Sequence, residues 1–534
     1  MKYKYILLTM VAAAFAFAFA SCSEEDYSDK YADPSKVPTP SVDKLMTGVL
    51  YTGRDFVTPN YWRFFAFDNQ DVGAIAQTWG MTTDAALYEG GFPPYIDEGW
   101  TKFQDVLSQF KLMEKYYLAS SAAEQAKYKP YYLSAKTFMF QCLLQTLDCW
   151  GDIPYSESGQ LPLTGKVVYP KKDDAKALYK MILDDLKTIN GDFKTIIDSK
   201  MSISAESDYI NDGNMGKWRK YANSIRLRAA IRLSIHGPSE LTAQAVNAIK
   251  EIFNNPTDYP VVTGADDMIK VVNRRAGDFN WSRMEGSGDW RTCRLASKAM
   301  VDALDNDPRL PLIYDKVLGG GNEGKYVGVN TRDQSAAVSV AINGDNFGGT
   351  CQYSYVNETS FRENKNIEGY VVTPSEIAFY KAEAIVRGFV TGDEKAEFIR
   401  ALRESVRLYA NINDKSDAPS ATLTRSPKVD MSRWTDETVK SWAEGKWGDT
   451  PANQLKAIYE QTWLHFGIIN SLQSWNTIRR TGHPALHYPT VNSQKCPNVP
   501  QRFVVPQAEW TVNPNIEKEN TPEAYYQKLF WANP

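Results

Sequence analysis

The sequence predicts a mostly α-helical protein whose helices frame one long irregular region. Apolar residues recur at three- and four-residue spacing on both sides of the middle of the chain. Short loops join several of these segments in consecutive pairs, as in helical-repeat arrays. Between 237 and 373, glycine, aspartate, asparagine and aromatic residues largely replace the helical stripes. Because long irregular segments on a rigid scaffold commonly carry function, we expect the binding residues to be concentrated there.

The helical segments follow one another along the chain with recognisable start signals. Ser121 and Glu124 form the two ends of a capping box, which predicts a helix running through Leu147. Pro130 should kink or restart that helix, because proline removes a backbone hydrogen bond. Apolar stripes predict the other helices at 96–117, 174–186, 215–234, 375–387, 395–408 and 452–478.

The chain opens with the pattern of a secretory signal peptide. Lys2 and Lys4 precede a mostly apolar run that ends in small residues just before Cys22. A cysteine at the first mature position is the mark of a bacterial lipoprotein, whose thiol carries the lipid. We therefore predict a lipoprotein signal peptide at 1–21 and lipidation of Cys22. The alternative is a plain signal peptide followed by a chance cysteine.

The apolar run is also too short to span a relaxed bilayer, which takes about 20 apolar residues. The mature chain is therefore expected to be anchored to a membrane rather than threaded through it. Residues 22–40 are polar, acidic and dotted with proline, which predicts a flexible tether. Since no second linker follows, we expect 41–534 to form a single domain that contains the irregular region at about 237–373.

Composition excludes some functions and leaves others open. The 534 residues are 43% hydrophobic, enough for a large core. A net charge of −4 argues against nucleic-acid binding, which normally uses a basic surface. Aromatic residues make up 13% of the chain, a surplus that serves either a core or a surface that stacks on sugar rings. Five cysteines remain besides Cys22, and an odd number excludes a complete disulfide framework.

Several short motifs along the chain match one known pattern in the right order. The sequence WGDIPY at the end of the second long helix resembles the "yGDvPy" turn of SusD/RagB-type lipoproteins, and later stretches resemble further motifs of that family. Most of these motifs have structural explanations, such as glycine ending a helix, so they identify a fold rather than a site. The matching stretches are WGDIPY at 150–155, WRKYANSIRLR at 218–228, DPRLP at 307–311, KAEA at 381–384, RRTGHP at 479–484 and PQRF at 500–503.

The resemblance implies a SusD-like fold, with tetratricopeptide-like helix pairs supporting an irregular ligand-binding half. It implies a lipoprotein on the extracellular side of the outer membrane, consistent with the acidic residues that follow Cys22. Members of the family cover a SusC-like TonB-dependent transporter, capture an oligosaccharide and deliver it. They are not enzymes, and no cofactor is implied.

Candidate ligand-binding residues follow from their position relative to the family. An aromatic platform flanked by planar hydrogen-bonding groups is the arrangement that a sugar requires. The alternative for each aromatic residue is burial in the core. The aromatic candidates are Trp79, Tyr88, Trp281 and Trp290, and their polar neighbours are Asp84, Asn280 and Arg291.

Enzymatic and metal-binding interpretations have weak support. His483 and His487 have the spacing of a metal pair, but Pro484 lies between them and no HExxH motif is present. The GxxxxGK pattern ending at Lys325 is followed by Tyr326 in place of the serine or threonine of a P-loop. A glycosidase needs two carboxylates about 5–10 Å apart, which the sequence does not locate. We predict no catalytic residue and no metal ligand.

The sequence therefore predicts a surface-exposed, lipid-anchored glycan-binding protein that works with a SusC-like transporter. Two alternatives remain open. The same type of lipoprotein could capture peptides, as some relatives do, or the protein could be a surface glycosidase.

Overall fold

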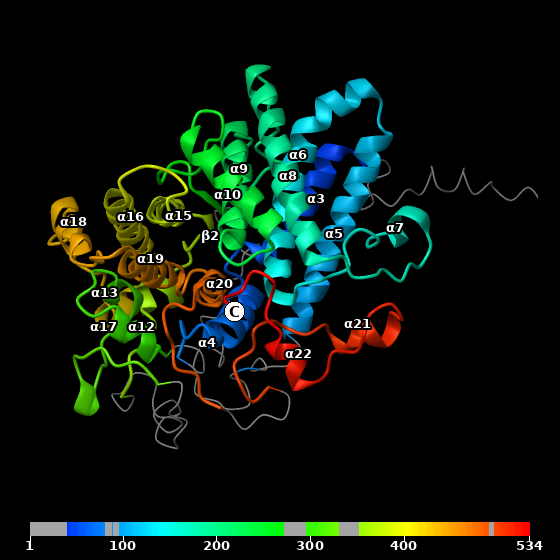
Figure 1. Cartoon of the computed structure of the whole chain (residues 1–534). Coiled ribbons are helices and arrows are strands. Elements are labelled where there is room, and N and C mark those ends of the chain that lie inside the picture. The colour runs from blue at the N-terminus through cyan, green and yellow to red at the C-terminus, as the bar shows by residue number, and fades with distance from the viewer. Residues whose placement is uncertain (1–39, 81–87, 89–94, 272–294, 331–351, 491–495) are drawn as a thin grey trace, which may run out of the picture.

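The structure is a computed structural model that describes residues 40–80, 88, 95–271, 295–330, 352–490 and 496–534 (Figure 1). Within these ranges the protein is mostly helical, as the sequence predicted. In none of the described helices is there a stretch long and apolar enough to cross a membrane.

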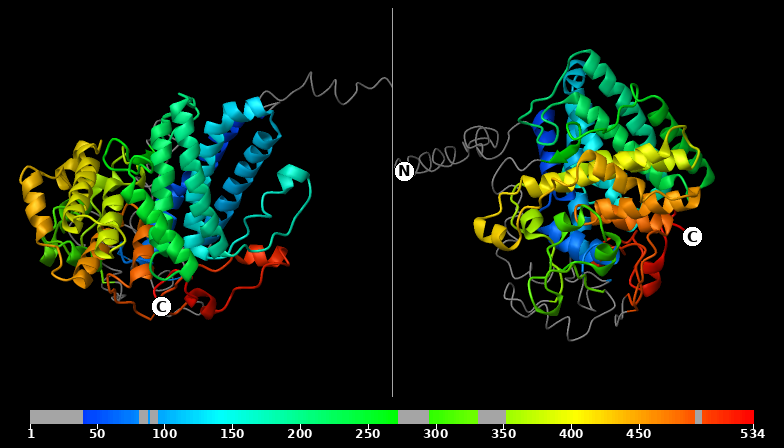
Figure 2. Two further views of the ribbon diagram at one scale, coloured as in Figure 1. Left: turned by 45° about the horizontal axis from the view of Figure 1, so that its top comes forward. Right: turned by 90° about the vertical axis from the view of Figure 1, so that its left-hand side faces the viewer.

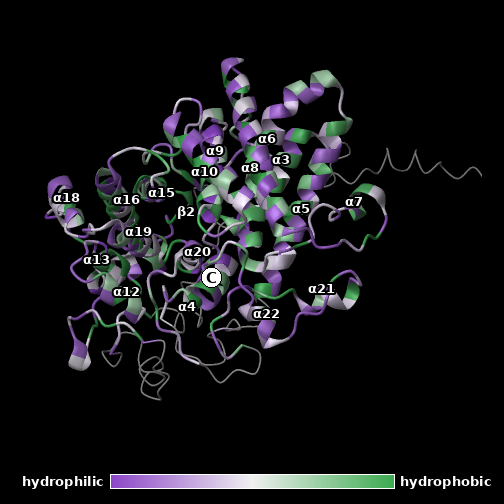
Figure 3. Cartoon of the chain, viewed as in Figure 1, coloured by the Kyte–Doolittle hydropathy of each residue, from purple (hydrophilic) through white to green (hydrophobic). Residues whose placement is uncertain are grey.

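A first array of long helices is built from the N-terminal half of the chain. Consecutive helices α5 and α6, and α8 and α9, pack against each other in pairs. Stripes of hydrophobic residues run along these helices, which Figure 3 shows in green. The elements are α3 (Val42–Thr52), η1 (Gly53–Phe56), η2 (Tyr61–Val72), α4 (Gly73–Ile75), α5 (Tyr95–Ala119), α6 (Ala122–Trp150), α7 (Leu161–Thr164), α8 (Ala175–Asp198), α9 (Met215–Leu233) and α10 (Ser239–Asn254).

A second array comes from the C-terminal part, and its helices lie across those of the first array in the right-hand view of Figure 2. Helices α15 and α16, and α19 and α20, are its consecutive pairs. The elements are α15 (Pro374–Val386), α16 (Glu394–Asp414), α17 (Ser420–Arg425), α18 (Asp436–Glu444), α19 (Pro451–Phe466) and α20 (Ser471–Thr481). The last two helices, α21 (Gln507–Val512) and α22 (Pro522–Tyr526), lie beside the first array instead (Figure 1).

Short elements connect the two arrays. Strand β1 (Ile269–Val271) pairs with β2 (Gly369–Val372) in an antiparallel ribbon, so that segments about 100 residues apart in sequence lie side by side. The other connecting elements are α12 (Lys298–Ala303), α13 (Leu310–Ile313), η4 (Gly320–Asn322) and η5 (Glu358–Arg362).

Helix α10 lies inside the region that the sequence predicted to be irregular. Its buried residues, which include Leu241, Ala245 and Ile249, form a regular stripe against α9. The alanines make this stripe weakly hydrophobic, so the sequence analysis missed it. The irregular region therefore begins after Asn254 rather than at 237.

The predicted helix at 452–478 is instead two helices, α19 and α20, separated at 467–470. A side chain at Gly467 would come within 2.9 Å of the Leu464 carbonyl oxygen and 2.8 Å of Met300. The break places the N-terminus of α20 near Asp68, where the backbone amides of Ser471 and Leu472 act to lower the pKa of its carboxyl. The positive amides and helix dipole at this end of α20 offset part of the cost of burying the Asp68 carboxylate.

Helix α6 begins with the predicted capping box at Ser121 and Glu124 and continues through Pro130 without restarting. Proline leaves one carbonyl of the preceding turn without its amide partner. Since the residues of that turn, such as Ala126, are exposed, water can satisfy the carbonyl. Helix α6 ends as predicted at Gly151, which has a φ of 78°.

Buried ion pairs join the two arrays. Arg228 on α9 donates from Nε and Nη2 to the two carboxylate oxygens of Glu376 on α15, at 2.6 and 2.7 Å. Arg228 also donates to the backbone carbonyl of Val371 in β2 at 2.6 Å and to Gln141 on α6 at 3.0 Å. One hydrophobic cluster runs from Val42 to Ala532 and includes residues of both arrays. Two smaller hydrophobic clusters, one around Phe379 and Phe398 and one around Leu295 and Val329, accompany this main core.

Candidate functional site

The described residues that flank several undescribed ranges meet at one face, the lower one in Figure 1. The Gly80 amide donates to the Leu295 carbonyl at 3.0 Å. Ser297 pairs with Val329 in a parallel bridge. The Tyr88 hydroxyl donates to the Pro489 carbonyl at 2.7 Å. Segments far apart in the sequence are therefore anchored side by side at this face.

An open hollow of about 520 Å³ lies at the same face. Helix α12 contributes Lys298 and Asp302, whose side chains are 52% and 59% exposed and form an ion pair of 2.6 Å. This volume is within the range of small-molecule binding sites. The other lining residues are Gln77, Ala299, Ala303, Val329, Asn330, Trp463, Pro484, Ala485, Leu486 and His487.

Residues 484–490, here called the strap, form one side of the hollow. Gln77 holds the strap by donating from Nε2 to the His487 carbonyl at 2.6 Å. The backbone of Gln77 has a φ of 51°, an uncommon left-handed conformation for a residue other than glycine. This turn follows α4 and directs the chain toward Trp79 and Gly80, so it links the scaffold to the hollow.

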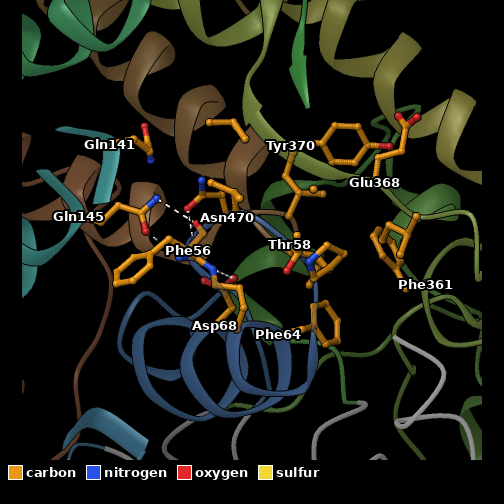
Figure 4. A pocket seen from close by; sticks show the side chains of 18 residues that line it. Phe56, Thr58, Phe64, Asp68, Gln141, Gln145, Phe361, Glu368, Tyr370 and Asn470 are labelled. Atoms are coloured by element: carbon orange, nitrogen blue, oxygen red, sulfur yellow. Dashed lines mark hydrogen bonds and ion pairs between the residues drawn. The ribbon is translucent and has the colours of Figure 1, made fainter. Parts of the chain in front are cut away.

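A buried polar cluster on η2 borders a separate pocket, which shares no lining residue with the hollow and is shown in Figure 4. Arg63 donates to Asp68 at 2.6 Å, to Gln145 at 3.1 Å and to Asn470 at 2.9 Å. Burial raises the pKa of Asp68 to about 6, although Arg63 and the amides of α20 act in the opposite direction. The cluster borders a crevice of only about 30 Å³, which has room for ordered water but not for a sugar ring.

The described candidate residues lie near the hollow but are buried. The Trp79 side chain is 0% exposed, and its ring packs edge-on against Phe64 with centroids 4.9 Å apart. Tyr88 is 2% exposed. Both residues lie near the strap. Gln77, two residues before Trp79, donates to the His487 carbonyl, and the Tyr88 hydroxyl donates to the Pro489 carbonyl. Asp84, Asn280, Trp281, Trp290, Arg291 and Cys22 lie outside the described residues, so those assignments remain predictions.

Sequence analysis did not identify the residues that line the hollow. Trp463 lies in the helix predicted at 452–478, and in the structure its indole N–H donates to the Ala76 carbonyl at 2.9 Å. His487 was considered only as one of a metal pair with His483. Lys298, Asp302 and Asn330 carried no local signal, because their common position depends on how distant segments meet. Within the described ranges, no group of three or more histidine, cysteine, aspartate or glutamate side chains is placed to hold a metal ion.

Comparison with known proteins identifies relatives over nearly the whole chain. Residues 35–506 match the SusD-like family described as "Starch-binding associating with outer membrane". No curated protein matches the sequence significantly.

Solved structures share the fold at low sequence identity. A chitin-binding protein is 22% identical, with a TM-score of 0.69, covering 92% of this chain and 100% of its own. A SusD homolog from Bacteroides fragilis is 18% identical, with a TM-score of 0.68 and coverages of 92% and 99%. A chitin-binding SusD homolog from Flavobacterium johnsoniae is 17% identical, with a TM-score of 0.62 and coverages of 92% and 98%.

Proposed function

Because the chain belongs to the SusD-like family of outer-membrane-associated proteins, we propose that it is a lipid-anchored receptor that captures oligosaccharides at the cell surface. The open hollow is the proposed capture site. The receptor would deliver its ligand to a SusC-like TonB-dependent transporter, and the lipid on Cys22 would hold it at the outer membrane.

The observation that carries this proposal is the size and openness of the hollow, which lies where Gln77 meets the strap. A volume of about 520 Å³ accommodates a sugar residue and its neighbours. Gln77, Asn330, Lys298 and Asp302 present amide and charged groups that can hydrogen-bond to hydroxyls. Trp281 and Trp290, from the region that precedes Leu295, are the proposed aromatic contributors, whereas the buried Trp79 and Tyr88 would support the chain beside the hollow.

A binding function is favoured over hydrolysis by the chemistry of the described lining. Hydrolysis of a glycosidic bond normally needs two carboxylates, one of which carries a proton or attacks the sugar. Among the described residues that line the hollow, Asp302 is the one acid, and it is paired with Lys298 at 2.6 Å. Two of the structurally similar proteins are chitin-binding proteins and the family description names starch, so chito-oligosaccharides and starch fragments are the first ligands to test.

The test is to incubate the full chain, purified in detergent, with immobilised glycan pools and with a peptide pool, and to analyse both retention and products. We expect retention of glycans without release of shorter sugars. Released sugar would establish a glycosidase, and retention of peptides alone would establish a peptide receptor. Either result would overturn the proposed function.

A further inference from the structure

A second, smaller cavity of about 150 Å³ lies where the end of α20 meets the last residues of the chain. The Asn533 amide donates to the Arg479 carbonyl at 2.7 Å and so holds these two segments together. The strap separates the two cavities: His487 lines the open hollow, and the next residue, Tyr488, lines this smaller cavity. The other residues used below are Trp475, Arg479, Gln501 and Lys528.

Arg479 is a buried cation that lacks a directly bonded carboxylate. Its guanidinium stacks on the Trp475 ring at 3.5 Å and donates to the backbone carbonyls of Gln501 and Asp148 at 2.8 and 2.7 Å. Its third acceptor is the side-chain oxygen of Asn476. The Nε–H of Arg479 is buried and has no acceptor among the described residues.

The neighbouring residue shows how this protein otherwise treats a buried arginine. Arg480 donates to both carboxylate oxygens of Glu383. Arg479 bonds to the backbone carbonyl of Asp148 but not to its carboxylate. That carboxylate instead accepts hydrogen bonds from Tyr179, Arg232 and Asn476. Buried charges are normally paired, so the charge of Arg479 is incompletely compensated.

The surroundings of the cavity reinforce this imbalance. Burial lowers the pKa of Arg479 to about 10, against the attraction of Asp148. Lys528 is exposed at the cavity and has no ion pair within the described part of the chain. The described lining therefore contains two cationic side chains and no acidic one.

We propose that this cavity binds a small oxyanion, either a free anion such as sulfate or the carboxylate of an acidic sugar. Arg479 and Lys528 supply the positive charge, and the side-chain amides of Gln501 and Asn533 supply further N–H donors. This site is separate from the open hollow, so it does not depend on capture of neutral glycans there.

The test is isothermal titration calorimetry of the full chain in a Tris chloride buffer of constant ionic strength. The probes are sodium sulfate, sodium glucuronate and neutral glucose. Lys528→Ala removes one cation of the cavity from an exposed position, which leaves the fold intact. Lys250→Ala is the matched control, because it removes the same charge from an exposed position on α10.

We expect saturable binding of at least one oxyanion, no heat from glucose, and an affinity about tenfold weaker in Lys528→Ala but unchanged in Lys250→Ala. Arg479→Lys keeps the charge but loses the planar fork, and it should also weaken binding. Binding of sulfate alone assigns the site to a free anion, and binding of glucuronate alone assigns it to an acidic sugar. Absence of saturable binding by both probes, or equal affinity in the two lysine variants, would overturn the proposal.

Discussion

Glu383 and Arg480, 97 positions apart in the chain, share two hydrogen bonds of 2.7 and 2.6 Å in a buried setting. Glu383 also accepts a bond from Arg387 at 3.0 Å. Burial raises the pKa of Glu383, but the two arginines outweigh this effect and hold the pKa below its usual value. The pair thus ties the last turn of α20 to α15.

Glu383→Gln should lower the free energy of unfolding by about 3 to 5 kcal/mol, because it leaves the Arg480 guanidinium buried without a counter-charge. Urea unfolding at neutral pH measures the change. Since the folded-state pKa is lowered, the contribution of Glu383 is present above the unfolded-state pKa and is lost as the pH falls through the folded-state value. Asp198→Asn breaks an exposed pair with Lys194 and serves as the control, with no measurable change expected. Equal stability of Glu383→Gln and the wild type would contradict the prediction.

Asp68 should make the protein less stable as the pH rises from about 4 to 6. Its folded-state pKa is about 6 against a usual value of 3.8. A carboxyl with a raised pKa favours folding below the unfolded-state pKa, and this advantage is lost as the pH rises through the folded-state value. The difference corresponds to about 3 kcal/mol at most. Unfolding curves of the wild type and Asp68→Asn across this range test it: their stability difference should change with pH, and a constant difference would disprove the raised pKa.

Asp302→Ala and His487→Ala should weaken glycan retention severalfold without lowering the melting temperature, because both side chains line the hollow and are exposed. Lys250→Ala provides an exposed control outside the hollow. Retention is measured by affinity electrophoresis in gels that contain the polysaccharide. If both hollow variants migrate like the wild type, capture takes place elsewhere.

Trp281→Ala should weaken retention in the same assay if its ring forms part of the aromatic platform. Trp79→Ala requires a different readout, because its fully buried side chain packs on Phe64. Loss of this ring should destabilise the fold by about 3 to 5 kcal/mol. Unfolding of Trp79→Ala at the wild-type denaturant concentration would show that the ring adds little to the core.

Cys22→Ser should release the protein from the outer membrane, since the lipid would be attached to this thiol. Fractionation of cells and labelling with an alkyne fatty acid measure membrane attachment and acylation. The wild type should carry the label and be digested by protease added to intact cells. An unlabelled wild-type protein in the soluble fraction would refute both the anchor and the surface location.

Local signals predicted the helices well, and non-local packing accounts for what was missed. The capping box at Ser121 and the glycine end at Gly151 depend on a few neighbouring residues, and both were correct. The break after Phe466 was missed because the stripe of apolar residues continues on both sides, while the crowding at Gly467 involves Met300, a residue far away in the sequence.

The candidate site was harder to predict for the same reason. Aromatic residues such as Trp79 could be selected by their position in the family pattern, but their burial could not be read from composition. Lys298, Gln77 and His487 meet because the helix, the turn after α4 and the strap converge in space. No short-range pattern in the sequence encodes that convergence.

The bidentate pair of Arg228 and Glu376 limits how far α9 and α15 can move apart. Separating α9 from α15 would strip two charges of their partners, a cost of several kcal/mol that thermal motion rarely supplies. The two helical arrays are therefore expected to move as one rigid unit rather than to close around a ligand like a clamshell.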